Sequence, residues 1–316
     1  MRYDAVRWLP ALVFTTLIIA PAHAETPDFD GAFWQHWGDG HAELAGYDLT
    51  FPRYRELRKG IAVTIFVTET FSNELRVKSD PGQHAASDEF SVMKLNLIQD
   101  FPTGIYDYNM MTSTFVALQP VNGRPAGIPT KVSFSSQEWC GHAYQQLLFD
   151  TREIRFQANS YFDGEADRQD KLDFPPGGLS EDALLLWARG FAAPALKAGQ
   201  TRTVPILRSV QVARLRHVPL VWQEATLSRS QTSQRVSVPA GEFDVQVMTV
   251  KIADERTWTF FVEAAPPNRL IKWQTSDGQE ADLLGSDRLK YWKMNANGFE
   301  SGLAKFGLKP RETRAP

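Results

Sequence analysis

Apolar and polar residues alternate along most of this chain, in runs that are short and clearly bounded. The run GIAVTIFVTETF at 60–71 is rich in β-branched and aromatic residues and begins at a glycine. A period of two residues is typical of strands that bury one face. Comparable runs lie at 94–101, 104–118, 130–149, 152–162, 235–252, 256–265 and 269–275.

Turn signals separate several of these runs. Asn122-Gly123, Pro239-Ala240-Gly241 and Asp277-Gly278 each lie between strand-like segments. Asp-Gly between two such segments is a strong signal for a tight hairpin, and sequential hairpins produce an antiparallel sheet. We therefore predict an all-β, predominantly antiparallel fold, a curved half-barrel or barrel-like sheet with one or two short helices.

The clearest helix signal is SEDALLLWARG at 180–190. Ser180 is a good N-cap, acidic residues follow it in the first turn, and Gly190 comes directly after Arg189. The helix is short and largely apolar, so we expect it to pack against the sheet.

A polar segment divides the chain near its middle. Residues 162–180 are mostly charged or polar and include Pro175-Pro176-Gly177-Gly178. This composition marks a boundary between a β-rich half at 25–170 and a second at 171–316, although the two halves could form one continuous domain.

The N-terminus has the order of a secretory signal peptide. Arg2 and Arg7 precede an apolar run, and Ala22-His23-Ala24 is a small-x-small cleavage site. The run from Ala11 to Ala20 is about half the ~20 residues that a spanning helix needs. We predict cleavage after Ala24, a periplasmic location and no integral membrane segment in the mature chain.

Charge and motifs exclude several classes of function. The formal net charge is −3, which gives no indication of a nucleic acid partner. The chain contains no G-x-S-x-G, HExxH, P-loop or G-x-G-x-x-G motif. We therefore predict no cofactor.

The segment SSQEWCGHAY at 135–144 contains the only cysteine. If 130–149 is one strand, Glu138, Cys140 and His142 share a face. An imidazole beside a thiol can generate the reactive thiolate, with a carboxylate orienting the base. Cys140, His142 and Glu138 are therefore candidate catalytic residues.

A structural interpretation of the same segment is favoured. Free cysteine is among the most frequently buried residue types, so we expect neighbours on the strand to shield Cys140. A hairpin that pairs Phe149 with Arg152 would place His142 opposite Asn159. A metal site would need more ligands than Cys-x-His supplies, and none is predicted.

Two charged segments are further candidates for binding sites. The acidic residues of DGEADRQDKLD at 163–173 lack the spacing of a calcium loop and are interpreted as a solvated loop. Arg53, Arg55, Arg58 and Lys59 could meet an anion. We interpret them as the exposed approach to the buried strand at 60–71.

Parts of the sequence resemble known groups of exported bacterial proteins. The segments FWQHWGDGHAELAGYDL, GIYDYNMMTSTF and QEWCGHAY are similar to a group without established function, some members of which carry the automatic name septum formation inhibitor. The segments ALLLWARG and VPAGEFDVQVMTVKI resemble a second β-rich domain, marked by a VPAG-x-F-D turn. The resemblance implies a barrel-like or half-barrel fold in the cell envelope and no particular activity.

Two functional hypotheses follow. The favoured one is a non-enzymatic periplasmic protein that binds a small apolar ligand, or supports an envelope component, on the concave face of its sheet. The alternative is a thiol-dependent enzyme that uses Cys140 and His142.

Overall fold

A single large sheet organises the computed structural model, which describes residues 25–253 and 255–310. The predicted signal peptide lies outside these residues. The first half of the chain contains α1 (Gly31–Trp37), β1 (Ala42–Arg53), β2 (Glu56–Ser72), β3 (Glu89–Pro102), β4 (Asp107–Ala117), β5 (Pro129–Glu138), β6 (Gly141–Phe149), β7 (Glu153–Ser160) and β8 (Arg168–Asp173). The second half contains β9 (Leu179–Ser180), η1 (Glu181–Ala183), α2 (Leu184–Ala188), β10 (Thr201–Leu207), α3 (Val210–Arg216), β11 (Trp222–Arg229), β12 (Gln234–Val238), β13 (Gly241–Ile252), β14 (Thr257–Glu263), β15 (Leu270–Thr275), β16 (Glu280–Leu289), η2 (Tyr291–Lys293) and η3 (Phe299–Phe306).

The sheet is mainly antiparallel and open, which confirms the predicted fold class. Its strands run in the order β8-β7-β6-β5-β4-β3-β2-β1-β16-β15-β14-β13-β11-β10-β9, with β12 paired to β13. Only the short pairing of β9 with β10 is parallel among the described strands. Because β1 pairs with both β2 and β16, the two halves of the chain belong to one continuous sheet.

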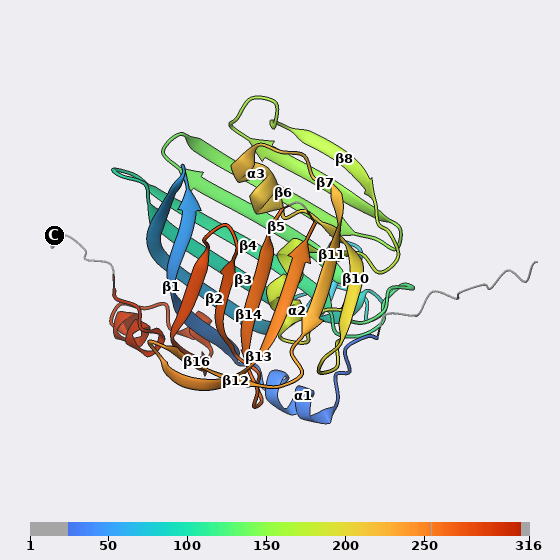
Figure 1. The fold of residues 1–316 in the computed structure, drawn as a ribbon. Helices are drawn as coiled ribbons and strands as arrows, with labels where there is room; N and C mark the ends of the chain where they lie inside the picture. The colour runs from blue at the N-terminus through green and yellow to red at the C-terminus, as the bar shows by residue number, and fades with distance from the viewer. Residues whose placement is uncertain (1–24, 254, 311–316) are drawn as a thin grey trace, which may run out of the picture.

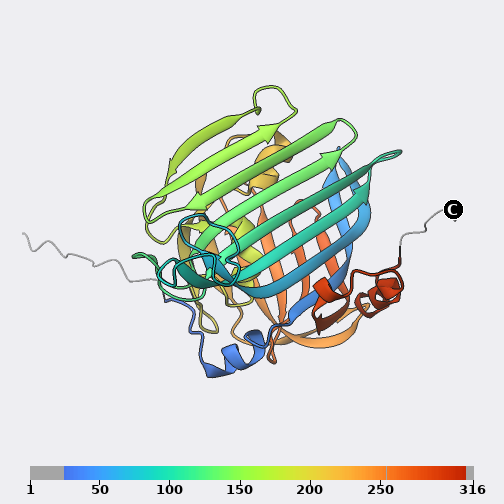
Figure 2. The same cartoon turned by 180° about the vertical axis from the view of Figure 1, so that it is seen from behind.

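The sheet curves so that its two halves face one another. Figures 1 and 2 show β2 to β8 as one layer and the strands from β16 to β10 as the other, with α2 between them. Every residue of α2 is buried, as expected for a helix that is apolar on all sides. The predicted helix at 180–189 is confirmed as η1 followed by α2, with Ser180 as the N-cap of η1.

One edge of the sheet carries the hairpin turns that matter for function. The turns β1–β2, β3–β4, β5–β6, β7–β8 and β15–β16 lie at the same edge, because alternate connections of an antiparallel sheet return to one side. This hairpin edge is at the top in Figure 1, where α3 also lies. The connection from β10 to β11 carries α3 to the same edge.

Candidate functional site

The segment around Cys140 forms a hairpin and not one long strand. β5 ends at Glu138, β6 begins at Gly141, and these two residues pair across the turn. The expected row of Glu138, Cys140 and His142 on one strand face is therefore wrong. The reason is the length of the neighbouring strand. β4 begins at Asp107, and its pairing with β5 ends at Asn109 and Gln137, so residues beyond Glu138 have no strand to pair with and the chain turns back.

The pairing of β6 with β7 also differs from the expected register. Phe149 pairs with Ile154, and the amide of Tyr161 donates to the His142 carbonyl at 2.9 Å. The shift is two residues, so each side chain keeps its predicted face. The longer turn lets the Asp150 backbone N–H donate to the Glu153 carbonyl at 2.8 Å, while the Asp150 side chain pairs with Arg76 at 2.6 Å.

Cys140 is exposed, which corrects the expectation of a shielded thiol. The Glu138 carboxylate accepts a hydrogen bond from the Cys140 backbone N–H at 2.8 Å. A hydrogen bond from the thiol to Glu138, and the negative charge of Glu138, raise the pKa of the Cys140 thiol. A thiol nucleophile needs the opposite shift, so this geometry gives the thiol-enzyme hypothesis no support.

The other predicted candidates are dispersed in the structure. Within the acidic segment, Glu165 contacts His217 Nδ1 at 2.7 Å and Arg214 Nε at 3.3 Å, while its acidic neighbours are exposed. His41, a residue type that can bind a metal, lies 3.2 Å from Asp39 and far from Cys140 in the sequence. In the described part of the chain, no group of three or more His, Cys, Asp or Glu side chains could hold a metal ion.

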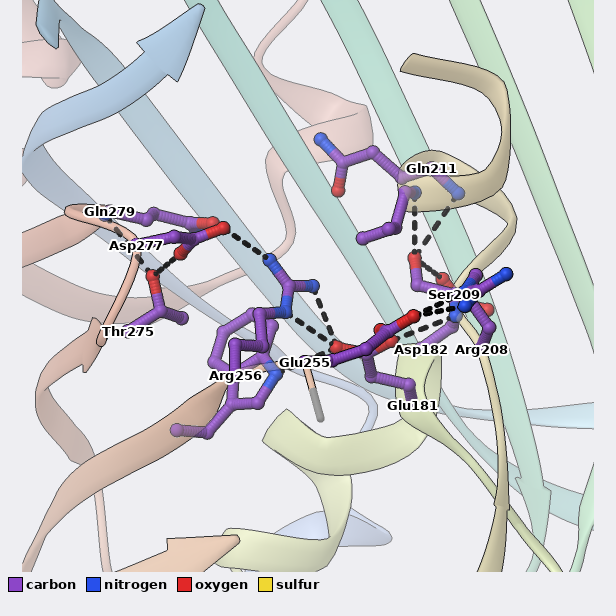
Figure 3. A network of polar contacts seen from close by, with 12 residues as sticks. Glu181, Asp182, Arg208, Ser209, Gln211, Glu255, Arg256, Thr275, Asp277 and Gln279 are labelled. Atoms are coloured by element: carbon purple, nitrogen blue, oxygen red, sulfur yellow. Dashed lines mark hydrogen bonds and ion pairs between the residues drawn. The ribbon is translucent and has the colours of Figure 1, made fainter. Parts of the chain in front are cut away.

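A buried polar network lies beneath the hairpin edge (Figure 3). At its centre, Glu181 is 2% exposed. Its carboxylate accepts hydrogen bonds at 2.8 Å from Arg256 Nε and Trp258 Nε1, and at 2.9 Å from the Ser209 amide. Because a buried charge is tolerated only when it is paired and hydrogen-bonded, Glu181 fixes β14 and the start of α3 around it.

The neighbouring carboxylate, Asp182, attaches α3 to the rest of the molecule. It accepts hydrogen bonds from the Ser209 hydroxyl at 2.6 Å, the Ser180 hydroxyl at 3.1 Å and the Val210 amide at 3.2 Å. Burial nevertheless raises the pKa of Asp182 to about 6. Ser209 is also the N-cap of α3, so this short helix is held at its first turn.

A cleft of about 370 Å³ opens above this network, between the β1–β2 turn, α3 and the β15–β16 turn. Its polar lining consists of Arg53, Tyr54, Arg55, Gln211, Arg216, Arg256, Asp277 and Gln279. Its apolar lining consists of Phe51, Pro52, Val212 and Leu215. We call it the arginine cleft, because four arginines face a single carboxylate there.

The four arginines are fixed to different degrees. Arg53 donates to the Leu215 carbonyl and to the Tyr108 hydroxyl, each at 2.8 Å, while its buried Nε has no hydrogen-bond partner in the described part of the chain. Arg216 pairs with Asp277 at 2.5 Å, and Arg256 lies 3.6 Å from the same carboxylate. Arg55 makes no hydrogen bond or ion pair with any described residue. The cleft therefore keeps donors for a further anion.

The turn that supplies Tyr54 and Arg55 is strained. These two residues form the loop between the paired residues Arg53 and Glu56, with φ of 55° and 63°. Such a turn favours Asn-Gly, because side chains with a Cβ rarely adopt φ above zero. Each residue with positive φ costs about 1–3 kcal/mol of conformational free energy, and such strain is frequent at ligand sites. Without Gly or Asn, the sequence offered no hairpin signal here.

Comparison with known proteins adds no family to this description: no family model, curated protein or solved structure matches the chain. The resemblance to exported bacterial proteins therefore stays a prediction. What the structure defines is a class: an open, curved antiparallel sheet with a basic cleft at its hairpin edge.

Proposed function

We propose that this chain is an exported binding protein that holds a small anionic ligand in the arginine cleft. The observation that carries the proposal is the convergence of Arg53, Arg55 and Arg216 from the β1–β2 turn and α3, above the buried Arg256. Guanidinium groups present planar donors that match carboxylate and phosphate oxygens in pairs.

The charge of the cleft contrasts with that of the chain. The whole sequence has a formal net charge of −3, yet this cleft has four arginines against Asp277. A concave basic site in an acidic protein concentrates the electric field and raises the local concentration of anions. The contacts of the Asp277 carboxylate with Arg216 and Arg256 support a ligand that carries a carboxylate.

The cleft also has a limited apolar wall. Phe51, Val212 and Leu215 line it beside the arginines. A ligand with a compact apolar body and an anionic head fits this lining, which refines the small apolar ligand expected from the sequence.

Export and location belong to the same proposal. The signal peptide pattern at 1–24 supports a periplasmic protein. Among the described residues, no helix has the length and hydropathy needed to cross a membrane. Binding without catalysis is favoured because the thiol at Cys140 is on another hairpin and its pKa is raised.

Calorimetric titration of the mature protein with inorganic phosphate, acetate and succinate at low salt tests the proposal. We expect at least one anion to bind, with an affinity that falls as salt rises. Arg55→Gln, at an exposed position with no ion pair or hydrogen bond to any residue of 25–253 or 255–310, should weaken binding about tenfold. Arg235→Gln, on β12 away from the cleft, is the matched control and should bind as wild type. Absence of binding to all three anions, or unchanged binding by Arg55→Gln, would overturn the proposal.

A further inference from the structure

A row of aromatic rings continues from the arginine cleft along the hairpin edge: Tyr54 and Trp139 are exposed, Tyr106 is half-buried and Tyr108 is buried. Ring centroids are 6.2 Å apart between Tyr54 and Tyr108, 6.1 Å between Tyr108 and Tyr106, and 6.1 Å between Tyr106 and Trp139. Tyr54 is 50% exposed and Trp139 is 73% exposed. We call Tyr54, Tyr106 and Trp139 the aromatic ledge. They come from the β1–β2, β3–β4 and β5–β6 turns, which lie at the same edge of the sheet.

Tyr108 fixes the ledge from below and joins it to the cleft. This residue is buried, and its hydroxyl lies 2.7 Å from the Tyr54 hydroxyl. Arg53, which lines the arginine cleft, donates to the Tyr108 hydroxyl at 2.8 Å and places its guanidinium 4.2 Å from the Tyr54 ring centroid. The cleft and the ledge are therefore parts of one pre-organised surface, which lowers the entropic cost of binding.

Large exposed aromatic side chains require a physical explanation, because water contact with their rings is unfavourable. Their flat faces suit ligands with apolar faces and polar edges. The ring of a pyranose sugar has this character: C–H groups cover its faces and hydroxyls surround its edge.

The charges beside the ledge differ from those in the cleft. Asp107 begins β4 directly after Tyr106, and Glu138 ends β5 directly before Trp139, both turn residues of the ledge. Carboxylates accept hydrogen bonds from hydroxyls and repel further anionic groups. A ligand that covers both regions would be anionic at the cleft and uncharged along the ledge.

We propose that the ligand is an oligosaccharide with one acidic sugar at its end: the acidic group binds the arginine cleft and the neutral sugar rings stack on Tyr54, Tyr106 and Trp139. The inference rests on the proposed anion binding and specifies its ligand class. A nucleic acid would place a phosphate at every unit, including those beside Asp107 and Glu138. The same carboxylates disfavour an anionic membrane surface.

Titration calorimetry with four probes tests this inference: free glucuronate, cellotetraose, a cello-tetrasaccharide that ends in one glucuronate, and phosphatidylglycerol vesicles. We expect the acidic tetrasaccharide to bind about tenfold more tightly than free glucuronate. Trp139→Ala should remove this difference and leave the affinity for free glucuronate unchanged. Trp292→Ala, at a partly exposed tryptophan of the C-terminal η2, is the control and should retain it.

The outcomes separate this inference from anion binding itself. Equal affinities for free glucuronate and the acidic tetrasaccharide, or an unchanged preference in Trp139→Ala, would overturn the inference while supporting the arginine cleft. Binding of phosphate, without binding of glucuronate or the acidic tetrasaccharide, would overturn the oligosaccharide inference and leave anion binding in place. Binding of vesicles but of no saccharide would overturn it in favour of a membrane surface. Failure of every anion would overturn both proposals.

Discussion

The Ser209 hydroxyl donates a hydrogen bond of 2.6 Å to the Asp182 carboxylate, 27 residues earlier in the chain. This contact joins the N-cap of α3 to η1, the 3-10 turn that precedes α2. Because α3 forms one wall of the arginine cleft, the position of that wall depends on a half-buried carboxylate. The stability of this attachment and its response to pH can both be measured.

Asp182 should make stability depend on pH. Burial raises its pKa to about 6 from an ordinary value of 3.8. Its contribution to the free energy of unfolding is therefore fully present below about pH 4 and is lost as pH rises through about 6. Urea unfolding of wild type and Asp182→Asn at pH 4, 5, 6 and 7 should show the wild type losing on the order of 1–3 kcal/mol relative to the variant across this range. A difference that does not change with pH would contradict this assignment.

Glu181→Gln should be strongly destabilising. It leaves the buried Arg256 without the carboxylate that accepts its hydrogen bonds at 2.7 and 2.8 Å. Breaking one side of a buried ion pair costs about 3–5 kcal/mol. The exposed pair of Lys171 and Glu153 provides the comparison, since Lys171→Gln should cost less than about 1 kcal/mol. Chemical denaturation at pH 7 measures both, and similar losses would refute the structural role of Glu181.

Replacing Tyr54-Arg55 with Asn-Gly should separate stability from binding. The new turn adopts φ above zero without strain, so thermal and urea unfolding should show a gain of about 1–2 kcal/mol. The same change removes one arginine and one ring from the ligand surface, so the anion affinity measured by calorimetry should fall. A variant that is more stable and binds as well as wild type would show that the strained turn has no role in recognition.

The reactivity of Cys140 should be controlled by Glu138 and not by His142. The thiol is exposed, but the hydrogen bond to Glu138 and its charge raise the thiol pKa. Alkylation of the native protein should therefore be slow at pH 7 and accelerate only above the ordinary thiol pKa. Glu138→Gln should accelerate labelling at pH 8, and His142→Ala should leave the rate unchanged. A slower rate in His142→Ala would restore the imidazole as an activating base.

The sequence by itself determined the class of fold, because alternation with a period of two residues directly encodes which side of a strand is buried. The Asp277-Gly278 turn and the helix after Ser180 were also local signals, since capping and turn chemistry depend on a few adjacent residues. No local signal marked the turn at Trp139-Cys140, because β5 ends where its pairing with the neighbouring strand β4 ends. Likewise, Arg53 and Arg55 appeared as an ordinary charged segment. Only the curvature of the sheet brought them to Arg216 and Arg256, which follow them by more than 150 residues in sequence, because charges become a site through distance in space and not through spacing along the chain.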